Sequence, residues 1–325
     1  MLQTIEPIPI EYEEEYKLLA ADLDSRLPDK ALDKNLLIAT WNLRAFGDLF
    51  SNWVAGANDT PKRDKQSLLC IAEIVSRFDV IAIQEVKGNL RCLGHMLKLL
   101  GPDWNFTMTD VTRGRPGNDE RMAFVFDSRK LQLSGLAGEL VVPEEKLTEI
   151  KPDALTRQFA RTPYAVSFKT AGHTFILTTL HVLYGGNAAA RKPELKAIAE
   201  WLVEWAGDIN AWDHNLIALG DFNIDRQDDE LYQAFTSTGL RTPDDLNRVP
   251  RTLFSDPDKP NLDKFYDQIA WFPQLEGKPT FALKYNRGGS FDFTPVVLMS
   301  RGLTRQALSY RISDHYPLWA EFLVR

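Results

Sequence analysis

A carboxylate and a carboxamide lie two residues apart in the segment 219–223, at the end of the apolar run 215–219. In an extended strand, residues i and i+2 share a face, so we expect Asp221 and Asn223 to point at one target. Such a pair suits a phosphoryl centre, because the carboxylate can hold a metal or orient water and the amide can donate to a developing oxyanion. Taken alone, the segment is equally typical of a turn, since Gly, Asp and Asn all favour turns.

Four other segments carry polar side chains at the ends of apolar runs that we interpret as buried strands. They cover residues 36–47, 79–87, 174–181 and 311–319, and the polar residues in them are Asn42, Glu85, His181, Asp314 and His315. Sheets of α/β proteins place their sites where buried strands end. We therefore expect these side chains to meet Asp221 and Asn223 in one site.

In this order, the segments resemble the endonuclease/exonuclease/phosphatase superfamily, and within it the deoxyribonuclease I branch. The resemblance covers about residues 35–325. Features typical of the branch are the run 42–47, the Glu-Arg pair 120–121, the Arg-x-Pro stretch 161–163 and the stretches 291–293 and 312–317. His181 is a further match, because abasic-site endonucleases of the exonuclease III type lack a histidine there. The resemblance implies an α/β fold: a two-sheet β-sandwich flanked by helices, the deoxyribonuclease I-like four-layer sandwich.

The resemblance also implies roles for two histidines. His315 is similar to the general base of the family, and Asp267 matches the carboxylate that orients it. His181 is similar to the histidine that protonates the leaving oxygen, and Glu120 matches its partner. A neighbouring carboxylate fixes the tautomer of an imidazole and raises its basicity. Asp221 and Asn223 would then position water and phosphate.

A divalent metal is the expected cofactor. Glu85 is the best single ligand, because a buried strand delivers it and carboxylate oxygens suit Mg²⁺ or Mn²⁺. The resemblance implies that Asn42 and Asp314 complete or support this metal site. No Cys/His cluster in the sequence points to zinc.

Three basic residues are expected to bind substrate. Arg44 and Lys87 match positions where the branch has basic groups near the phosphate backbone. Arg161 is expected to contact phosphate, since a guanidinium fork fits phosphate oxygens. Asn118 falls near the position of a tyrosine that enters the minor groove in the branch, and its different chemistry weakens the case for duplex binding.

These observations predict a divalent-metal-dependent phosphodiester hydrolase, with DNA the favoured nucleic-acid partner and an endonucleolytic cut. Sphingomyelinases and inositol polyphosphate phosphatases share the superfamily's chemistry, so a small-molecule or lipid phosphoesterase on the same site stays open. A catalytically silent binding protein is disfavoured, because every expected catalytic position is filled.

Charge and composition narrow these functions further. The 325 residues carry a formal net charge of −7, which disfavours a general charge-driven coat for nucleic acid. We interpret Lys62, Arg63 and Lys65 as an ordinary solvated face. The sequence shows no apolar run of membrane-spanning length and no secretory segment in residues 1–16, so we expect a cytoplasmic protein with no membrane insertion. The two cysteines, Cys70 and Cys92, are expected to be reduced thiols.

The expected organisation is an N-terminal helical extension at residues 1–34 followed by the endonuclease/exonuclease/phosphatase domain at 35–325. Residues 10–27 have apolar side chains at helical spacing and precede Pro28, so we expect a helix that packs on its own domain. Further helices are expected at 64–77, 89–100 and 191–209, and a long loop at 241–262.

Overall fold

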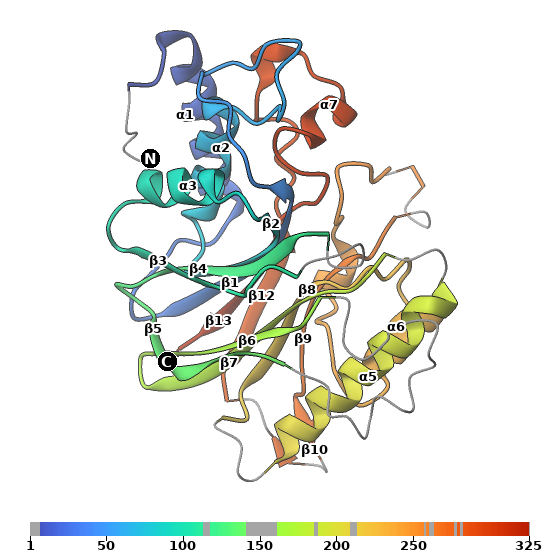
Figure 1. Cartoon of the computed structure of the whole chain (residues 1–325). Helices are drawn as coiled ribbons and strands as arrows, with labels where there is room; N and C mark the ends of the chain where they lie inside the picture. Colours follow the sequence, from blue (N-terminus) through green and yellow to red (C-terminus); the bar gives the residue numbers. More distant parts are fainter. Residues whose placement is uncertain are drawn as a thin grey trace.

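The computed structural model describes residues 7–112, 118–140, 161–184, 188–208, 213–256, 258–259, 263–275, 278–279 and 282–324. Within these ranges the strands form two large sheets that pack face to face (Figure 1). The expected two-sheet sandwich flanked by helices is therefore confirmed.

The first sheet has six described strands and contains the first and last strands of the chain. Their order is β12 (Lys284–Ser290), β13 (Leu318–Leu323), β1 (Asn35–Phe46), β2 (Val80–Lys87), β4 (Glu120–Asp127) and β3 (Trp104–Met108). β1 and β2 are parallel and place Asn42 opposite Gln84, whereas β13 runs antiparallel to β1. The carboxyl ends of β1 and β2 and the amino end of β4 therefore share one edge.

The second sheet has five described strands. Their order is β5 (Gln132–Glu139), β6 (Tyr164–Thr170), β7 (His173–His181), β8 (Leu216–Asp221) and β9 (Asp267–Trp271). A small hairpin, β10 (Gln274–Leu275) and β11 (Lys278–Pro279), follows. The register places His181 opposite Asp221, and Asp221 opposite Asp267. Three expected catalytic residues thus lie in one row across three neighbouring strands.

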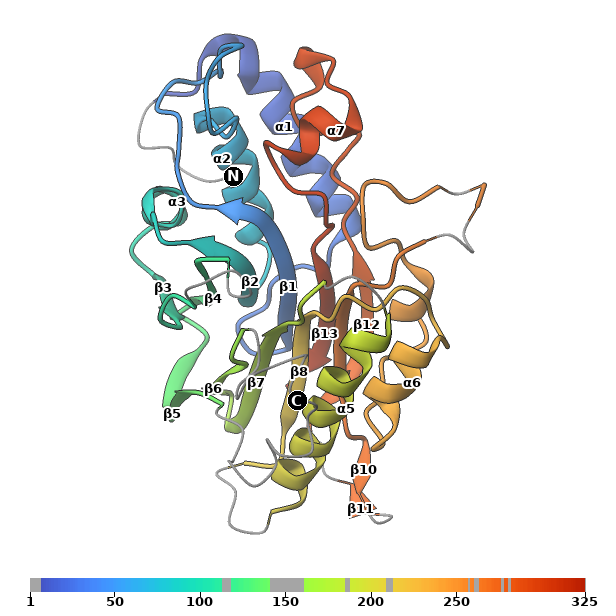
Figure 2. The same ribbon diagram turned by 45° about the vertical axis from the view of Figure 1, so that its right-hand side comes forward.

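Helices cover the outer face of each sheet (Figures 1 and 2). α1 (Ile10–Arg26), α2 (Lys65–Val75) and α3 (Arg91–Leu100) lie beside the first sheet, and α5 (Ala188–Gly207) and α6 (Glu230–Thr236) beside the second. The connecting segments contain η1 (Leu246–Arg248), η3 (Met299–Arg301) and α7 (Arg305–Ser309). The sequence analysis missed α6, which is short. Asp229 caps its N-terminus, because the Asp229 carboxylate accepts from the Leu231 and Tyr232 amides at 2.9 and 2.8 Å.

Alternation along β1 explains why its sequence is almost continuously apolar. Leu37, Ala39 and Trp41 face the helices, while Leu36 and Ile38 face the other sheet, and all five are fully buried. A strand covered on both faces needs apolar side chains at successive positions. The site-bearing ends of β1 and β2 are therefore fixed by cores on both faces of the sheet.

The N-terminal helix α1 packs on the domain, as its apolar spacing predicts. Leu19 and Leu23 are fully buried in the core under the first sheet. The Ser300 hydroxyl donates to Glu15 at 2.8 Å, and Arg26 donates to the Asp292 carbonyl at 2.9 Å. None of the helices described here is long and apolar enough to cross a bilayer.

Candidate active site

The backbone is irregular where the strands that carry the expected site residues end. The register of β1 and β2 shifts between Asn42 and Phe46, and that of β2 and β4 shifts between Ile83 and Val86. Positive φ angles occur at Arg44 (37°), Ala45 (50°), Glu85 (61°) and Asn223 (49°). Such angles are uncommon outside glycine, and strained backbone of this kind gathers at functional sites.

Asn42 links a carboxylate from each sheet. Its side-chain amide nitrogen donates to Glu85 Oε1 and to Asp221 Oδ2, both at 3.0 Å. Its amide oxygen accepts from the Arg44 backbone N–H at 2.9 Å, which fixes the orientation of the amide. The other oxygen of Glu85 accepts from the Ala45 N–H at 2.8 Å. Asn42 thereby holds Glu85 of β2 beside Asp221 of β8.

His315 is backed by the buried carboxylate of Asp267. Its Nδ1 lies 2.7 Å from Asp267 Oδ2, and its Nε2 lies 3.8 Å from Asp221 Oδ2. Burial by itself lowers the pKa of His315, but the nearby carboxylates of Asp267, Asp221 and Asp314 outweigh it and raise the pKa to about 10. The imidazole is therefore held protonated at neutral pH in the metal-free protein.

His181 has the matching arrangement on the other side of Asp221. Its Nδ1 lies 3.3 Å from Glu120 Oε2, and its Nε2 lies 3.7 Å from Asp221 Oδ2. Burial raises the pKa of Glu120, but the close contact and charge of His181, with the cations Arg161 and Lys87, outweigh burial and lower it to about 2. Glu120 therefore stays ionised as the partner of His181.

The three residues expected to bind substrate are each paired with another side chain. Lys87 Nζ lies 2.9 Å from Glu120 Oε1, and Arg161 Nε lies 2.9 Å from Glu120 Oε2. Arg161 is largely buried, with 9% of its side chain exposed. Arg44 donates to Ser309 Oγ at 2.7 Å and to Asp314 Oδ2 at 3.3 Å. All three lie at the site, but their charges are shared with carboxylates.

Asn223 reaches the site by a turn, so the expectation of a continuing strand is wrong. β8 ends at Asp221, and the left-handed backbone of Asn223 directs its own N–H to Asp221 Oδ1 at 3.0 Å. The side-chain amide donates to the Val182 carbonyl at 2.6 Å, which ties the end of β8 to the end of β7. Asp221 and Asn223 are neighbours through this turn and not through strand alternation.

The oxygen donors at the β1–β2 edge fit a hard divalent ion. Mg²⁺ is commonly held by one or two carboxylates, with water and substrate phosphate in the remaining positions. Glu85 is partly exposed, and Asp314 approaches the same edge through Arg44. The amide oxygen of Asn42 faces the Arg44 N–H, so this side chain is placed to orient Glu85. The described residues contain no cluster of three or more His, Cys, Asp and Glu side chains suited to a metal.

Arg63 is a supporting residue that the sequence analysis missed. It is 2% exposed, so the interpretation of Lys62, Arg63 and Lys65 as one solvated face is wrong for this residue. Its guanidinium donates to five carbonyl oxygens, those of Leu43, Arg44, Ala45, Arg311 and Ile312, at 2.9–3.2 Å. It thereby ties the end of β1 to the chain just before Asp314. A basic residue in a short polar stretch carries no sequence signal of this role.

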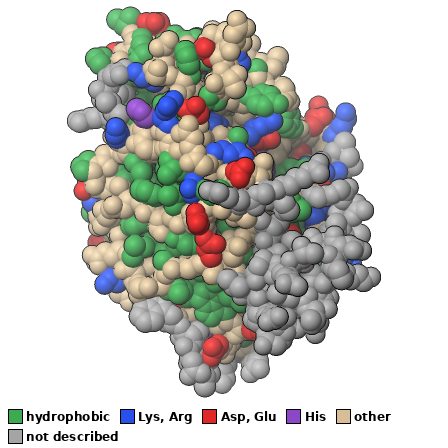
Figure 3. Space-filling model, in the orientation of Figure 1, with side chains coloured by type: hydrophobic (Ala, Val, Ile, Leu, Met, Phe, Trp, Pro, Cys, Tyr) green, Lys and Arg blue, Asp and Glu red, His purple; other side chains and the backbone are tan. Residues whose placement is uncertain are grey.

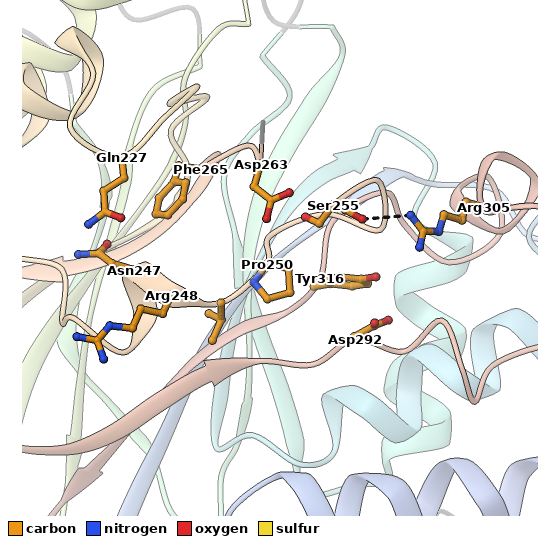
Figure 4. A pocket seen from close by; sticks show the side chains of 11 residues that line it. Gln227, Asn247, Arg248, Pro250, Ser255, Asp263, Phe265, Asp292, Arg305 and Tyr316 are labelled. Atoms are coloured by element: carbon orange, nitrogen blue, oxygen red, sulfur yellow. Dashed lines mark hydrogen bonds between the residues drawn. The ribbon is translucent and has the colours of Figure 1, made fainter. Parts of the chain in front are cut away.

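A separate pocket of about 550 Å³ lies beyond the site (Figure 4). It is lined by Phe265 and Tyr316, among others, and Arg305 crosses its rim to donate to the Ser255 carbonyl at 3.1 Å. Tyr316 follows His315 in the chain, yet neither His315 nor any other expected site residue lines this pocket. The candidate site is instead the polar cluster around Asp221.

The sequence and the fold are both similar to those of known proteins. A "Deoxyribonuclease" of Thioalkalivibrio sp. (strain K90mix) is 26% identical over 304 residues, covering 91% of this chain and 73% of that protein. An endonuclease/exonuclease/phosphatase family protein from Bacteroides thetaiotaomicron superposes with a TM-score of 0.59 and 21% identity, over 90% of this chain and 98% of that one. The mannosyl-6-phosphatase Bt3783 of the same organism has a TM-score of 0.57 and 21% identity, over 88% and 99%.

The family match covers most of the chain. Residues 39–315 match the family described as "Endonuclease/Exonuclease/phosphatase family", a span that runs from the middle of β1 to His315. The chain is therefore a hydrolase of phosphoester bonds, and it belongs to the endonuclease/exonuclease/phosphatase family.

Proposed function

We propose that this protein is a divalent-metal-dependent DNA endonuclease. The observation that carries the proposal is the convergence of His181 and His315, each backed by a buried carboxylate, on one oxygen of Asp221. Hydrolysis of a phosphodiester needs a proton removed from water and a proton given to the leaving oxygen. Two imidazoles facing a common point can supply both.

In the proposed reaction, His315 removes a proton from the attacking water, and Asp267 holds its imidazole in the required orientation. His181 protonates the leaving oxygen, and Asp221 and Asn223 position water and phosphate. A divalent ion held by Glu85, with Asp314 nearby, would supply positive charge that stabilises the phosphoryl oxygens and lowers the pKa of His315 toward that of a general base. Arg44 supplies the cation next to this point.

DNA is favoured as the substrate by the relative named Deoxyribonuclease, which spans most of this chain. One observation favours a second candidate, a small-molecule or lipid phosphoesterase. Lys87 and Arg161 both pair with Glu120, which leaves fewer cations for a polyanion. A single phosphate ester needs fewer such contacts than a DNA strand.

The test is an assay of the purified protein with Mg²⁺, Mn²⁺ or EDTA on circular DNA in single-stranded and in duplex form, on sphingomyelin and on inositol phosphates. We expect metal-dependent cutting of the circular DNA, which has no ends and so requires an endonuclease. His181→Ala should abolish most of this activity, whereas His173→Ala, at the opposite end of the same strand, should not. Intact circular DNA together with turnover of sphingomyelin or an inositol phosphate would replace the proposal with the second candidate.

A further inference from the structure

Exposed aromatic side chains gather around the candidate active site. Across the described part of the chain, the aromatic residues with the largest exposed fractions, 41–58%, are Phe106, Tyr184, Phe254 and Tyr310. Tyr184 and Tyr310 each connect to residues of the site through one or two contacts. Aromatic rings left in water near a site are typical of binding surfaces, because they offer a large apolar face at low entropic cost.

Tyr310 lies on the Arg44 side of the site and is 50% exposed. The guanidinium of Arg44 stands 4.1 Å from the centre of the Tyr310 ring, and the backbone of Arg44 donates to Asn42. Tyr310 also lines a pocket of about 460 Å³ together with Lys62 and Arg311, and Arg44 is not part of its lining. This volume falls within the range of roughly 300–1,000 Å³ that is usual for small-ligand sites.

Tyr184 follows β7 of the five-stranded sheet, three residues after His181, and is 58% exposed. Its ring meets Tyr266 edge to face with centroids 6.1 Å apart, and the Tyr266 ring lies 5.7 Å from that of His315. The Arg191 guanidinium stands 5.3 Å from the Tyr184 ring. Tyr184 and Tyr310 thus repeat one arrangement, an exposed ring beside an arginine, within two contacts of the catalytic groups.

Phe254 follows a short chain segment whose backbone contacts Asp314 and His315. The backbone N–H of Leu253 donates to the Asp314 carbonyl at 3.1 Å, and Thr252 forms a β-bridge with His315. Phe254 follows directly and is 47% exposed. Phe106, by contrast, lies on the edge strand β3 opposite Val125, five residues along β4 from Glu120.

Arg44, Lys87 and Arg161 each pair with a carboxylate, which suits a strand with accessible bases better than a duplex. In the space-filling view, basic and acidic side chains are interspersed, with no broad basic face among the described residues on this side (Figure 3). A duplex offers phosphates and hides the faces of its bases, so it is held largely by cations. A single strand exposes the faces of its bases, which stack on aromatic side chains.

We propose that the substrate is single-stranded DNA, with one base stacked on Tyr310, which contacts Arg44, and another stacked on Tyr184, which reaches His315 through Tyr266. The inference rests on the proposed nuclease function and names the substrate form of that site. Arg44 lies between the Tyr310 ring and the catalytic cluster, where it meets a phosphate of the strand.

The experiment compares kcat/KM on three substrates of equal length: oligothymidylate, a strand of abasic tetrahydrofuran residues, and a duplex. We expect oligothymidylate to be cut fastest. Tyr310→Ala and Tyr184→Ala should each lower kcat/KM on oligothymidylate by roughly 5- to 150-fold, the range for loss of one stacked base. Both variants should act normally on the abasic strand, which keeps the phosphates and lacks the bases.

Two controls separate stacking from damage to the fold. Tyr310→Phe and Tyr184→Phe keep the ring and should retain most of the activity on oligothymidylate. Phe106→Ala removes an exposed ring on the edge strand β3 and should change kcat/KM on neither oligothymidylate nor the abasic strand. Equal losses on oligothymidylate and the abasic strand, or faster cutting of the duplex, would overturn the inference while leaving a nuclease. Failure on all three DNA substrates would overturn the proposed nuclease function itself.

Discussion

The Nε2 atoms of His181 and His315 lie 3.7 and 3.8 Å from the same atom, Oδ2 of Asp221. His181 ends a strand of the five-stranded sheet, and His315 precedes the last strand of the six-stranded sheet. Each imidazole turns its other nitrogen toward a buried carboxylate. The sandwich therefore brings two separately supported imidazoles to one point, and packing between the sheets controls their separation.

The first prediction concerns Asp267. Asp267→Asn should lower kcat by roughly 10²- to 10⁴-fold, because the amide no longer stabilises the correct tautomer and charge of His315. It should also lower the pKa of His315, which an NMR titration of the metal-free protein would measure. Asp292→Asn removes a carboxylate that lines the separate pocket and is the control. An unchanged kcat in Asp267→Asn would exclude the orienting role.

The raised pKa of His315 has a consequence for stability in the metal-free protein. A histidine whose pKa rises on folding, here from 6.5 to about 10, contributes stability that is fully present below pH 6.5. That contribution is lost as the pH rises toward 10. In Asp267→Asn the slope of unfolding free energy against pH between 6.5 and 10 should become flatter, as measured by urea unfolding at several pH values.

The second prediction concerns the metal. Glu85→Gln removes the charge with little change in volume, so Mn²⁺ binding measured by electron paramagnetic resonance should weaken and activity should fall by orders of magnitude. Asp48→Asn removes a nearby exposed carboxylate that pairs with Arg91 and should leave both unchanged. Near-normal turnover of Glu85→Gln at saturating Mg²⁺ would show that another residue is the essential ligand.

The third prediction concerns His181 and Glu120. His181→Ala should lower the rate on DNA by roughly 10²- to 10⁴-fold, but much less on a nitrophenyl ester of a nucleotide, whose leaving group needs no proton. Glu120→Gln combined with His181→Ala should be little slower than His181→Ala alone, because both residues serve one proton transfer. Equal losses on the two substrates would argue against the general-acid role of His181.

The buried strands and the polar residues at their ends could be predicted because both depend on local pattern, whereas the two-sheet arrangement came from resemblance to a family. Apolar runs mark strands buried on both faces, and polar residues at their ends then have only one edge of the sandwich to occupy. Resemblance to a family supplied the pairing of His181 with Glu120 and of His315 with Asp267, which spacing alone does not give. The strand-face argument for Asn223 failed because β8 ends at Asp221 and Asn223 itself has a left-handed backbone.

The supporting cations could not be predicted from the sequence. Arg251 is fully buried, and its Nε donates at 2.9 Å to the carbonyl of Asp267, the carboxylate partner of His315. In sequence it lies within a polar stretch that reads as a loop. Lys87 and Arg161 share Glu120 although they are far apart in the chain. Such roles depend on which carbonyls and carboxylates the tertiary fold leaves without partners.

The fourth prediction concerns Gly220, which precedes Asp221. Its φ is +144°, and a Cβ atom there would lie 2.1 Å from the Leu180 carbonyl oxygen of the neighbouring strand. Gly220→Ala should therefore lower the melting temperature, displace Asp221 and reduce activity. Gly138→Ala, where a Cβ would meet nothing within 4 Å, is the control and should behave as the wild type. A normal melting temperature for Gly220→Ala would mean that β7 and β8 can separate locally without cost.

The fifth prediction concerns Arg63, whose guanidinium holds the end of β1 against the segment before Asp314. Arg63→Lys keeps the charge, but an ammonium has three donors on a flexible stem and cannot serve five carbonyls at once. Each buried carbonyl left unpaired costs about 1–3 kcal/mol, so the melting temperature should fall clearly. Lys196→Met, which removes an exposed cation from α5, should change it little.

Arg63→Lys should also lower kcat at temperatures where the variant is fully folded, because the backbone of Arg44 and the chain leading to Asp314 lose a common support. Circular dichroism would establish the folded fraction, and Mn²⁺ binding would report on the edge that carries Glu85. A folded variant with normal kcat and normal Mn²⁺ affinity would show that Arg63 stabilises the fold without positioning the site. Loss of both kcat and Mn²⁺ affinity, with the fold intact, would show that buried Arg63 positions the site by holding the end of β1 against the segment before Asp314.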